Sequence, residues 1–358
     1  MISGLKEAML YETLLSGAVC CHVCSRRCTI APDRLGFCRV RKNIDGKLYA
    51  LNYGYVSSEA IDPVEKKPLY HFLPGTTTYS LGTFGCNFSC LHCQNHKISM
   101  PEESVYLAMS GDIGLSRFGE IITPEEVVQR ALLLDTKSVS FTYNEPTVWY
   151  EFVYDTAVTA KANGLYVILV TNGYMTPEAL ETIAPYIDAY RVDLKSFSDL
   201  FYSEICAAHL NPVLESIQKA KELGLHVEIV TLIIPGQNDG IEEAKAAAAW
   251  IFENVGPETP VHLNAFHPNY KMEDVAATPG STLDLLRNVY VDAGMDYVYI
   301  GNMISEYQNT FCPKCQSFLI SRVYSFGESV ELERNGDDFV CACCGNMIPI
   351  VCPEDIEF

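Results

Sequence analysis

Basic residues are scarce in this sequence. Its 25 lysines and arginines stand against 45 aspartates and glutamates, for a formal net charge of -20. Such a charge repels phosphate backbones, so long DNA or RNA is a poor partner unless a local basic patch overrides it. No apolar run approaches the roughly 20 residues of a membrane-spanning helix. The first fifteen or so residues include Lys6, Glu7 and Glu12 and lack the apolar core of a signal peptide. We therefore expect a cytoplasmic protein with no membrane partner.

Cysteine, by contrast, is abundant, with 15 residues in a chain of 358. The cysteines gather at positions 20–38, 86–93 and 312–352, and only Cys206 stands alone. In a large protein of a reducing compartment, closely spaced cysteine pairs bind metal more often than they form disulfides. The sequence therefore predicts three metal-binding groups, with Cys206 as an ordinary core or surface thiol.

The middle of the chain alternates strand-like and helix-like segments. The strand-like runs are TTYSLGTF, SVSFTY, YVILVTN, AYRVDLK, HVEIVTLIIP, VHLNAF and YVYIGN. The consecutive apolar residues 167–170 indicate a strand covered on both faces, as in a parallel sheet. Repeated strand–helix units predict an α/β fold, a partial or full (β/α) barrel with its chemistry at the carboxyl ends of the strands. A doubly wound open sheet is the alternative.

These patterns divide the chain into three parts. We expect a cysteine-rich N-terminal region at 1–75, a barrel at 76–301 and a zinc-ribbon-like tail at 302–358. Asp45 and Gly46 lie between apolar runs and predict a hairpin in the first part. Thr123, Pro124 and Glu126 have the spacing of a capping box and predict a helix start in the second.

A loop with three cysteines, GCNFSCLHC, follows the first strand of the barrel. A closed zinc site needs four ligands, and a cubane [4Fe-4S] cluster has four irons to ligate. Cys86, Cys90 and Cys93 would therefore leave one iron open for a ligand that is not protein. The alternative is a structural zinc loop that borrows His92 or His96 as its fourth ligand.

Several motifs in order along the chain resemble a known family. DPVEKKPLYHFLPG, GCNFSCLHCQN, TYNEPT, VTNGY, VDLKSF, LIIPGQND, HLNAFHPNYK and YIGN together resemble the radical S-adenosylmethionine (SAM) member of the AmmeMemoRadiSam system. That family is related to the glycyl-radical-enzyme activases, such as the pyruvate formate-lyase activating enzyme. The resemblance covers essentially the whole chain.

The resemblance implies a SAM site built from the strand ends. It implies that Cys86, Cys90 and Cys93 bind the cluster, with SAM on the open iron and Phe88 and His92 as shields. Asn144 and Glu145 would hold the SAM amine, although a capped turn before Pro146 is an alternative. Thr171, Asn172, Asp193 and Lys195 would converge on the same rim, the last two contacting the SAM carboxylate and ribose, and Ile234 would line the adenine pocket.

Substrate contacts are expected near the end of a late strand. The candidate catalytic residues are Asn264, His267 and Tyr270, although a lone histidine such as His267 is more often an ordinary core residue. The paired Lys66 and Lys67 either meet a substrate anion or form a solvated charge pair.

The two outer cysteine groups each offer four thiolates. In the tail, Cys312, Cys315, Cys341 and Cys344 predict a zinc ribbon, with Cys343 and Cys352 surplus. In the head, Cys21, Cys24, Cys28 and Cys38 form a compact group, with Cys20 left over. Zinc is favoured there because most compact four-cysteine knuckles are structural, and an auxiliary [4Fe-4S] cluster is the alternative.

The function expected from the sequence is that of a radical SAM enzyme acting on a small molecule. Its cofactors would be a [4Fe-4S] cluster and SAM, and its electrons would come from a low-potential donor such as flavodoxin or ferredoxin. The alternative is an activase that places a radical on a partner protein. A metal scaffold without turnover would not need so many polar motifs at strand ends.

Overall fold

The computed structural model describes residues 5–109, 120–323, 327–336, 338–354 and 356. At its centre is an eight-stranded sheet in the order β16-β15-β14-β13-β12-β11-β9-β8. The strands are β8 (Ser58–Pro63), β9 (Thr77–Gly82), β11 (Ser138–Phe141), β12 (Tyr166–Thr171), β13 (Ala189–Asp193), β14 (His226–Ile233), β15 (Val261–Ala265) and β16 (Val298–Gly301). The strands from β9 to β16 run parallel, and β8 pairs antiparallel with β9. The described edge strands β8 and β16 do not pair, so the barrel is partial.

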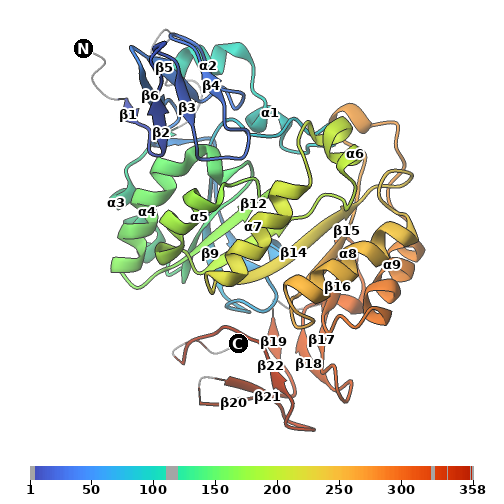
Figure 1. Cartoon of the computed structure of the whole chain (residues 1–358). Coiled ribbons are helices and arrows are strands. Elements are labelled where there is room, and N and C mark those ends of the chain that lie inside the picture. Colours follow the sequence, from blue (N-terminus) through green and yellow to red (C-terminus); the bar gives the residue numbers. More distant parts are fainter. Residues whose placement is uncertain (1–4, 110–119, 324–326, 337, 355, 357–358) are drawn as a thin grey trace.

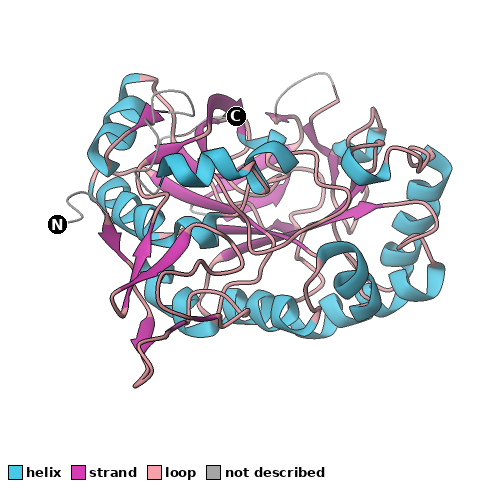
Figure 2. Cartoon of the chain, turned by 90° about the horizontal axis from the view of Figure 1, so that it is seen from above, coloured by secondary structure: helices cyan, strands magenta, loops and turns pink. Residues whose placement is uncertain are grey.

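Helices cover the outer side of this curved sheet (Figure 2). The main ones are α3 (Pro124–Leu133), α4 (Tyr150–Ala162), α5 (Pro177–Ile183), α7 (Asn211–Glu222), α8 (Ile241–Asn254) and α9 (Gly280–Asp292). Along β12, Val167 and Leu169 belong to the core beneath the helices, and Ile168 belongs to a second core on the inner face. This alternation confirms the parallel strand buried on both faces. Among the described residues, no helix has the length and apolarity needed to cross a membrane.

Local sequence signals set several element ends. Thr123 and Glu126 form the predicted capping box at the start of α3. Gly224 and Gly256 follow α7 and α8 with φ of 78° and 110°. Asp45 and Gly46, with φ of 52° and 80°, turn β5 (Arg41–Ile44) into β6 (Lys47–Ala50), which is the predicted hairpin.

The tail packs at the lower end of the molecule, and the head lies at the opposite end (Figure 1). The strands of the tail are β17 (Thr310–Phe311), β18 (Phe318–Ser321), β19 (Glu328–Ser329), β20 (Leu332–Asn335), β21 (Asp338–Cys341) and β22 (Met347–Ile348). Together with Leu69 and Phe72, the buried tail residue Leu319 forms a core with Ile168 on the inner face of the sheet. This end of the partial barrel is therefore filled with protein.

The head consists of short antiparallel strands beside the small helices α1 (His96–Ser99) and α2 (Glu103–Met109). Its other strands are β1 (Lys6–Glu7), β2 (Tyr11–Thr13), β3 (Val19–Cys21) and β4 (Thr29–Ile30), and β7 (Tyr55–Val56) pairs with β10 (Glu120–Ile121). An isolated bridge joins Cys24 to Met175, so the head contacts the loop that follows β12.

Candidate active site

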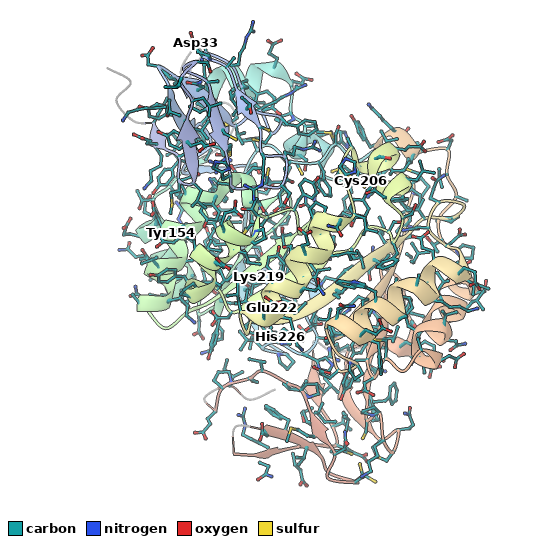
Figure 3. The ribbon with its side chains drawn as sticks, in the orientation of Figure 1. Asp33, Tyr154, Cys206, Lys219, Glu222 and His226 are labelled. Atoms are coloured by element: carbon teal, nitrogen blue, oxygen red, sulfur yellow. The ribbon has the colours of Figure 1, made fainter. Side chains whose placement is uncertain are left out.

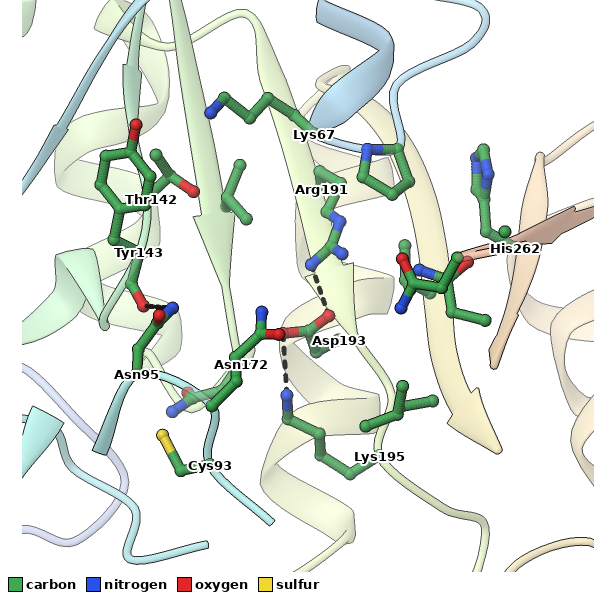
Figure 4. Close-up of a pocket in the computed structure, with 18 of the residues that line it drawn as sticks. Lys67, Cys93, Asn95, Thr142, Tyr143, Asn172, Arg191, Asp193, Lys195 and His262 are labelled. Carbon is green, nitrogen blue, oxygen red and sulfur yellow. Dashed lines mark hydrogen bonds and ion pairs between the residues drawn. The ribbon is translucent and has the colours of Figure 1, made fainter. Parts of the chain in front are cut away.

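A cavity of about 560 Å³ opens at the carboxyl ends of the parallel strands. Its walls come from the cysteine loop after β9 and from the ends of the later strands. Of the residues expected from the sequence, the lining includes Cys86, Cys90, Cys93, Asn144, Glu145, Thr171, Asn172, Asp193, Lys195, Asn264 and His267. Figure 4 shows side chains from several strands around this space. The fold thus brings together groups that are up to 181 positions apart, from Cys86 to His267.

The cysteine loop is held by contacts to distant segments. The Ser89 N–H donates a hydrogen bond of 3.0 Å to the Cys206 carbonyl oxygen. Gly85 has φ of +91°, and a Cβ there would lie 2.9 Å from the Cys38 carbonyl oxygen. A larger residue at this position would be strained and would press against the head. The loop and the head are therefore in direct contact.

Of the three loop cysteines, Cys90 is buried, and Cys86 and Cys93 are half-buried. Among the described residues, the sulfur atoms of Cys86, Cys90 and Cys93 do not form a group within 4.8 Å of one another. Two sulfurs on one zinc ion stand at most about 4.6 Å apart, because each Zn–S bond is about 2.3 Å long. The triad is thus too wide for a single ion, whereas the cubane places each thiolate on a different iron.

Cys206 lies beside this triad, which its isolated place in the sequence did not reveal. It is fully buried at the end of a π-helical turn, Tyr202–Cys206, next to α6 (Asp199–Phe201) (Figure 3). A hydrogen bond with Cys206, followed by burial, raises the pKa of Cys90. No sequence spacing links position 206 to position 90, so only the fold could reveal this neighbour.

Two aromatic side chains of the loop are buried. The Phe88 ring packs edge-on against Tyr174, with centroids 5.0 Å apart. His92 is buried, and its Nδ1 has no hydrogen-bond partner among the described residues. Burial lowers the pKa of His92 to about 3, so the ring is neutral near pH 7. Both side chains line the cavity beside the loop thiols.

Asn144 connects the end of β11 to the start of the cysteine loop. Its Oδ1 accepts a hydrogen bond of 3.0 Å from the Thr83 N–H, and its Nδ2 donates one of 2.7 Å to the Gly85 carbonyl oxygen. Both polar atoms of the side chain therefore orient the backbone that leads to Cys86.

The buried Glu145 carboxylate accepts hydrogen bonds from the end of the neighbouring strand β12. Its carboxylate accepts hydrogen bonds from the Thr147 N–H at 2.9 Å, the Thr171 hydroxyl at 2.7 Å and the Asn172 N–H at 2.8 Å. Burial raises the pKa of Glu145, and these hydrogen bonds act in the opposite direction. The carboxylate caps the 3-10 turn Pro146–Trp149, so the capped turn that the sequence left as an alternative is present. A SAM contact of Glu145 stays a prediction.

Asn172 connects the β12 end to the cysteine loop. Its Nδ2 donates to Asn87 Oδ1 at 2.7 Å and lies 3.8 Å from Cys86 Sγ. Its Oδ1 accepts from the Tyr174 N–H at 3.1 Å. The side chain therefore lies close to the Cys86 thiol.

A charged triplet projects from β13 into the cavity (Figure 4). Asp193 accepts from Lys195 Nζ at 2.8 Å and from the Arg191 guanidinium. Burial would raise the pKa of Asp193, but the positive charges of Arg191 and Lys195 outweigh it and lower that pKa. Arg191 Nε has no hydrogen-bond partner among the described residues. Arg191 was missed from the sequence, although the two-residue period of the strand places it on the same face as Asp193.

The wall opposite the cysteine loop is also polar. His262 Nε2 lies 2.7 Å from Glu228 Oε2, and both side chains are buried. Asn264 is buried in the lining, and its Oδ1 has no partner among the described residues. A Cβ at Gly301 would lie 2.1 Å from that oxygen, so glycine leaves the amide its room. Asn264 therefore offers an unused acceptor next to the cavity.

Lys67 and Lys66 both bind Asp62. Each ammonium nitrogen lies 2.6 Å from a different Asp62 oxygen, and the Tyr143 hydroxyl donates to the same carboxylate at 3.0 Å. Lys67 is 4% exposed, so it is not part of a freely solvated pair. Burial lowers the pKa of Lys67, and Asp62 opposes that effect.

Three of the residues expected at the site lie outside the cavity or at its edge. Ile234 is fully buried and outside the cavity lining, with its N–H bonded to Asn238 Oδ1 at 2.7 Å. Tyr270 stacks on His96 at 4.3 Å and lines a neighbouring open cavity. His267 is exposed at the cavity edge, so it is not an ordinary core histidine.

A family model described as the Radical SAM superfamily matches residues 80–248. This segment begins within β9, contains the cysteine loop and extends beyond the charged triplet of β13. The chain belongs to the radical SAM superfamily.

Relatives of this radical SAM protein include an uncharacterized protein of Methanocaldococcus jannaschii, MJ0808. It is 44% identical over 350 residues, which span 97% of this chain and 100% of that protein. A protein of the same organism whose name proposes it as a glycyl-radical enzyme activating enzyme is 27% identical over 172 residues, 47% of this chain and 60% of that protein. A solved domain of the pyruvate-formate lyase-activating enzyme from Bacteroides vulgatus ATCC 8482 aligns with a TM-score of 0.41 and 19% identity, covering 46% of this chain and 99% of that domain.

Membership in the radical SAM superfamily implies a [4Fe-4S] cluster and SAM. The donor set fits both groups. Three thiols stand too far apart for one ion, and the cavity beside them holds cationic, anionic and neutral polar groups. The cluster would be held by Cys86, Cys90 and Cys93, and SAM would lie against the polar strand ends.

The tail cysteines form a tighter group than those of the radical SAM loop. The sulfur atoms of Cys312, Cys315, Cys341 and Cys344 all lie within 4.8 Å of one another. Cys312 and Cys344 are 3.6 Å apart, as are Cys315 and Cys341. Four thiols this close can surround one metal ion, which fits a metal-binding C-terminal extension.

Proposed function

We propose that this radical SAM protein abstracts a hydrogen atom from a small-molecule substrate bound in the cavity. When bound, the cluster and SAM supply an electron and a 5′-deoxyadenosyl radical that takes the hydrogen. The chain's own residues orient SAM, exclude water and hold the substrate. The observation that carries the proposal is a cavity of about 560 Å³ whose inner end, here called the floor, is closed by the segment that precedes β9.

The floor is formed by the segment that precedes β9. Glu65 and Tyr70 line the cavity, and the Tyr70 N–H donates to Glu228 Oε1 at 2.9 Å. From the tail, Arg322 donates to the Tyr70 carbonyl oxygen at 2.6 Å. Ligand cavities of about 300–1,000 Å³ hold one drug-sized molecule. With SAM inside, the remaining space suits a small substrate better than a protein loop.

The polar walls suggest how the ligands are held. Asp193 and Lys195 are proposed to contact the SAM ribose and carboxylate, with Arg191 as a further cation beside them. Asn264 offers an unused acceptor, and His267 stands at the mouth. We propose that these two residues face the substrate. Tyr270 would act from the neighbouring cavity through its stack on His96, which follows the cysteine loop.

The alternative function is the activation of a partner protein. The 27% identity to a protein named for glycyl-radical enzyme activation favours it, but that likeness covers 47% of this chain. It supports shared SAM chemistry more strongly than a shared substrate. A flavodoxin- or ferredoxin-type donor would serve either function. The AmmeMemoRadiSam assignment stays a prediction from the sequence motifs.

The proposal is tested by anaerobic turnover with SAM and dithionite. Cell extract of deuterium-grown cells is split by ultrafiltration into small molecules and proteins, and deuterium in 5′-deoxyadenosine is measured by mass spectrometry. We expect label from the small-molecule fraction alone. Label from the protein fraction alone would favour the activase. The variant with Cys86, Cys90 and Cys93 changed to Ala should release no 5′-deoxyadenosine, and release at the wild-type rate would overturn the assignment of the site.

A further inference from the structure

The head cysteines enclose a small cavity of their own. Cys21, Cys24, Cys28 and Cys38 all line it, and much of the rest of the lining is apolar, including Val23, Ile30 and Val148. All four thiols face the same small space, which also has Asn87 and Arg41 in its lining. They therefore form one site around a common centre.

The spacing of the sulfur atoms distinguishes this site from the tail. The four tail sulfurs lie within 4.8 Å of one another, and two pairs of them are 3.6 Å apart, which is close enough for one zinc ion. Among the described residues, no three sulfurs of the head group meet that limit. The same holds for the loop triad Cys86, Cys90 and Cys93. The head cysteines and the loop triad are thus both set wider than the tail cysteines.

We propose that the head holds a second [4Fe-4S] cluster, ligated by all four cysteines. A cubane places each thiolate on a different corner iron, so its four sulfurs surround the cluster and stand farther apart than the ligands of one ion. With four protein ligands, this cluster has no open iron and does not bind SAM. The inference concerns a separate site and goes beyond the proposed function.

The surroundings suit a buried, negatively charged cluster. Arg26 and Arg41 line the same cavity. Arg41 is 3% exposed and binds Glu151 through two hydrogen bonds of 3.0 and 2.8 Å, so its guanidinium is fixed in place beside the thiolates. Protein cover and fixed charge tune the reduction potential of such clusters. In the tail, by contrast, Cys315 is exposed, which a redox-inert zinc site tolerates.

The head site lies next to the SAM cluster loop. Asn87 lines the head cavity and directly follows Cys86, and its Oδ1 accepts from Asn172 in the active-site wall. Arg26 donates to the Asn87 carbonyl oxygen. Cys38 lines both the head cavity and the open cavity that Cys86 also lines. The two sites therefore share a wall that includes Asn87 and Cys38.

Metal analysis of the full chain, purified without oxygen and reconstituted with iron and sulfide, tests the proposal directly. We expect about eight irons and one zinc per chain. About four irons and two zincs would overturn the proposal in favour of a zinc site, and about six irons would indicate a two-iron cluster and also overturn it. This measurement needs no variant and so does not depend on a mutant folding.

Variants assign the irons to their sites. With Cys86, Cys90 and Cys93 changed to Ala, we expect about four irons to remain and to give the electron paramagnetic resonance signal of a reduced cubane after dithionite. The loss of all iron from this variant would refute the head cluster. Cys24→Ala combined with Cys38→Ala should lose about four irons and keep one zinc. Cys343→Ala is the control because Cys343 is outside both the head cavity lining and the four-sulfur group of the tail, and it should keep all metals.

The two proposals can fail separately. If the head cluster is present but 5′-deoxyadenosine is not formed, the proposed function fails and the head assignment stands. If 5′-deoxyadenosine is formed by a chain with four irons and two zincs, the head assignment fails alone.

Discussion

At the residue scale, Glu145 joins the ends of two parallel strands through its buried carboxylate. We predict that Glu145→Ala lowers the free energy of unfolding by about 3 kcal/mol, because it leaves the Thr147 and Asn172 N–H groups without their acceptor. Urea unfolding under anaerobic conditions measures the change. Glu253→Ala is the control, since Glu253 is exposed on α8 and should change stability little. Equal stability of the two variants would contradict the structural role of Glu145.

Asp193 is the second residue whose role can be measured in isolation. Asp193→Asn keeps the shape of the side chain but removes the charge between Arg191 and Lys195. If Asp193 binds SAM, affinity should fall about tenfold or more, since a charged hydrogen bond contributes about 1.5–3 kcal/mol. Anaerobic calorimetric titration measures it, with Asp199→Asn as an exposed control. Wild-type affinity in Asp193→Asn would reject this SAM contact.

At the scale of the elements, much of the sheet could be predicted from local pattern. Each strand-like run of the sequence became a parallel strand, because apolar period and turn residues are local signals. β8 was missed because its sequence SEAIDP is polar, and its pairing with β9 compensates for that. The links Lys67–Asp62 and Tyr70–Glu228 were also missed. The second joins residues 158 positions apart, and no local pattern encodes such a contact.

The junction between sheet and tail depends on the neutral form of His71. The Pro349 carbonyl can only accept, so His71 Nδ1 donates to it and Nε2 accepts from the Tyr299 hydroxyl at 2.6 Å. Burial lowers the pKa of His71 from 6.5 to about 3. Below about pH 6.5 the unfolded chain binds a proton that the folded chain does not. The contribution of neutral His71 to the free energy of unfolding is thus complete above about pH 6.5. It is lost as the pH falls toward 3, by about 1.4 kcal/mol per pH unit.

The pH dependence of urea unfolding between pH 7.5 and 5.5 checks this prediction. His71→Gln should be less stable at pH 7.5 but should lose stability less steeply as pH falls, because one titrating group is gone. His209→Gln is the matched control, since His209 is an exposed histidine outside this junction. An unchanged slope in His71→Gln would show that His71 does not titrate on unfolding.

At the scale of the whole molecule, the cysteine-rich head and tail pack against opposite ends of the barrel. The head touches the cluster loop through Gly85 and Cys38, at the end where the chemistry takes place. The tail supports the cavity floor through Arg322 and Pro349 at the other end. Substitution of the head cysteines should therefore change iron content and SAM chemistry. Substitution of the tail cysteines should first destabilise the segment that closes the cavity.

That difference gives a prediction for the tail. Cys315→Ala combined with Cys344→Ala removes half of a four-sulfur site, so the chain should lose one zinc and keep its irons. Protease should then cut the tail faster, because the knuckles depend on the metal for their fold. SAM binding should stay near wild type, since its expected contacts lie at the carboxyl ends of the strands. Cys343→Ala is a close control, as Cys343 is adjacent to Cys344 but outside the four-sulfur group. A loss of about four irons with the double substitution would instead make the tail a cluster site, which its close-set sulfur atoms argue against.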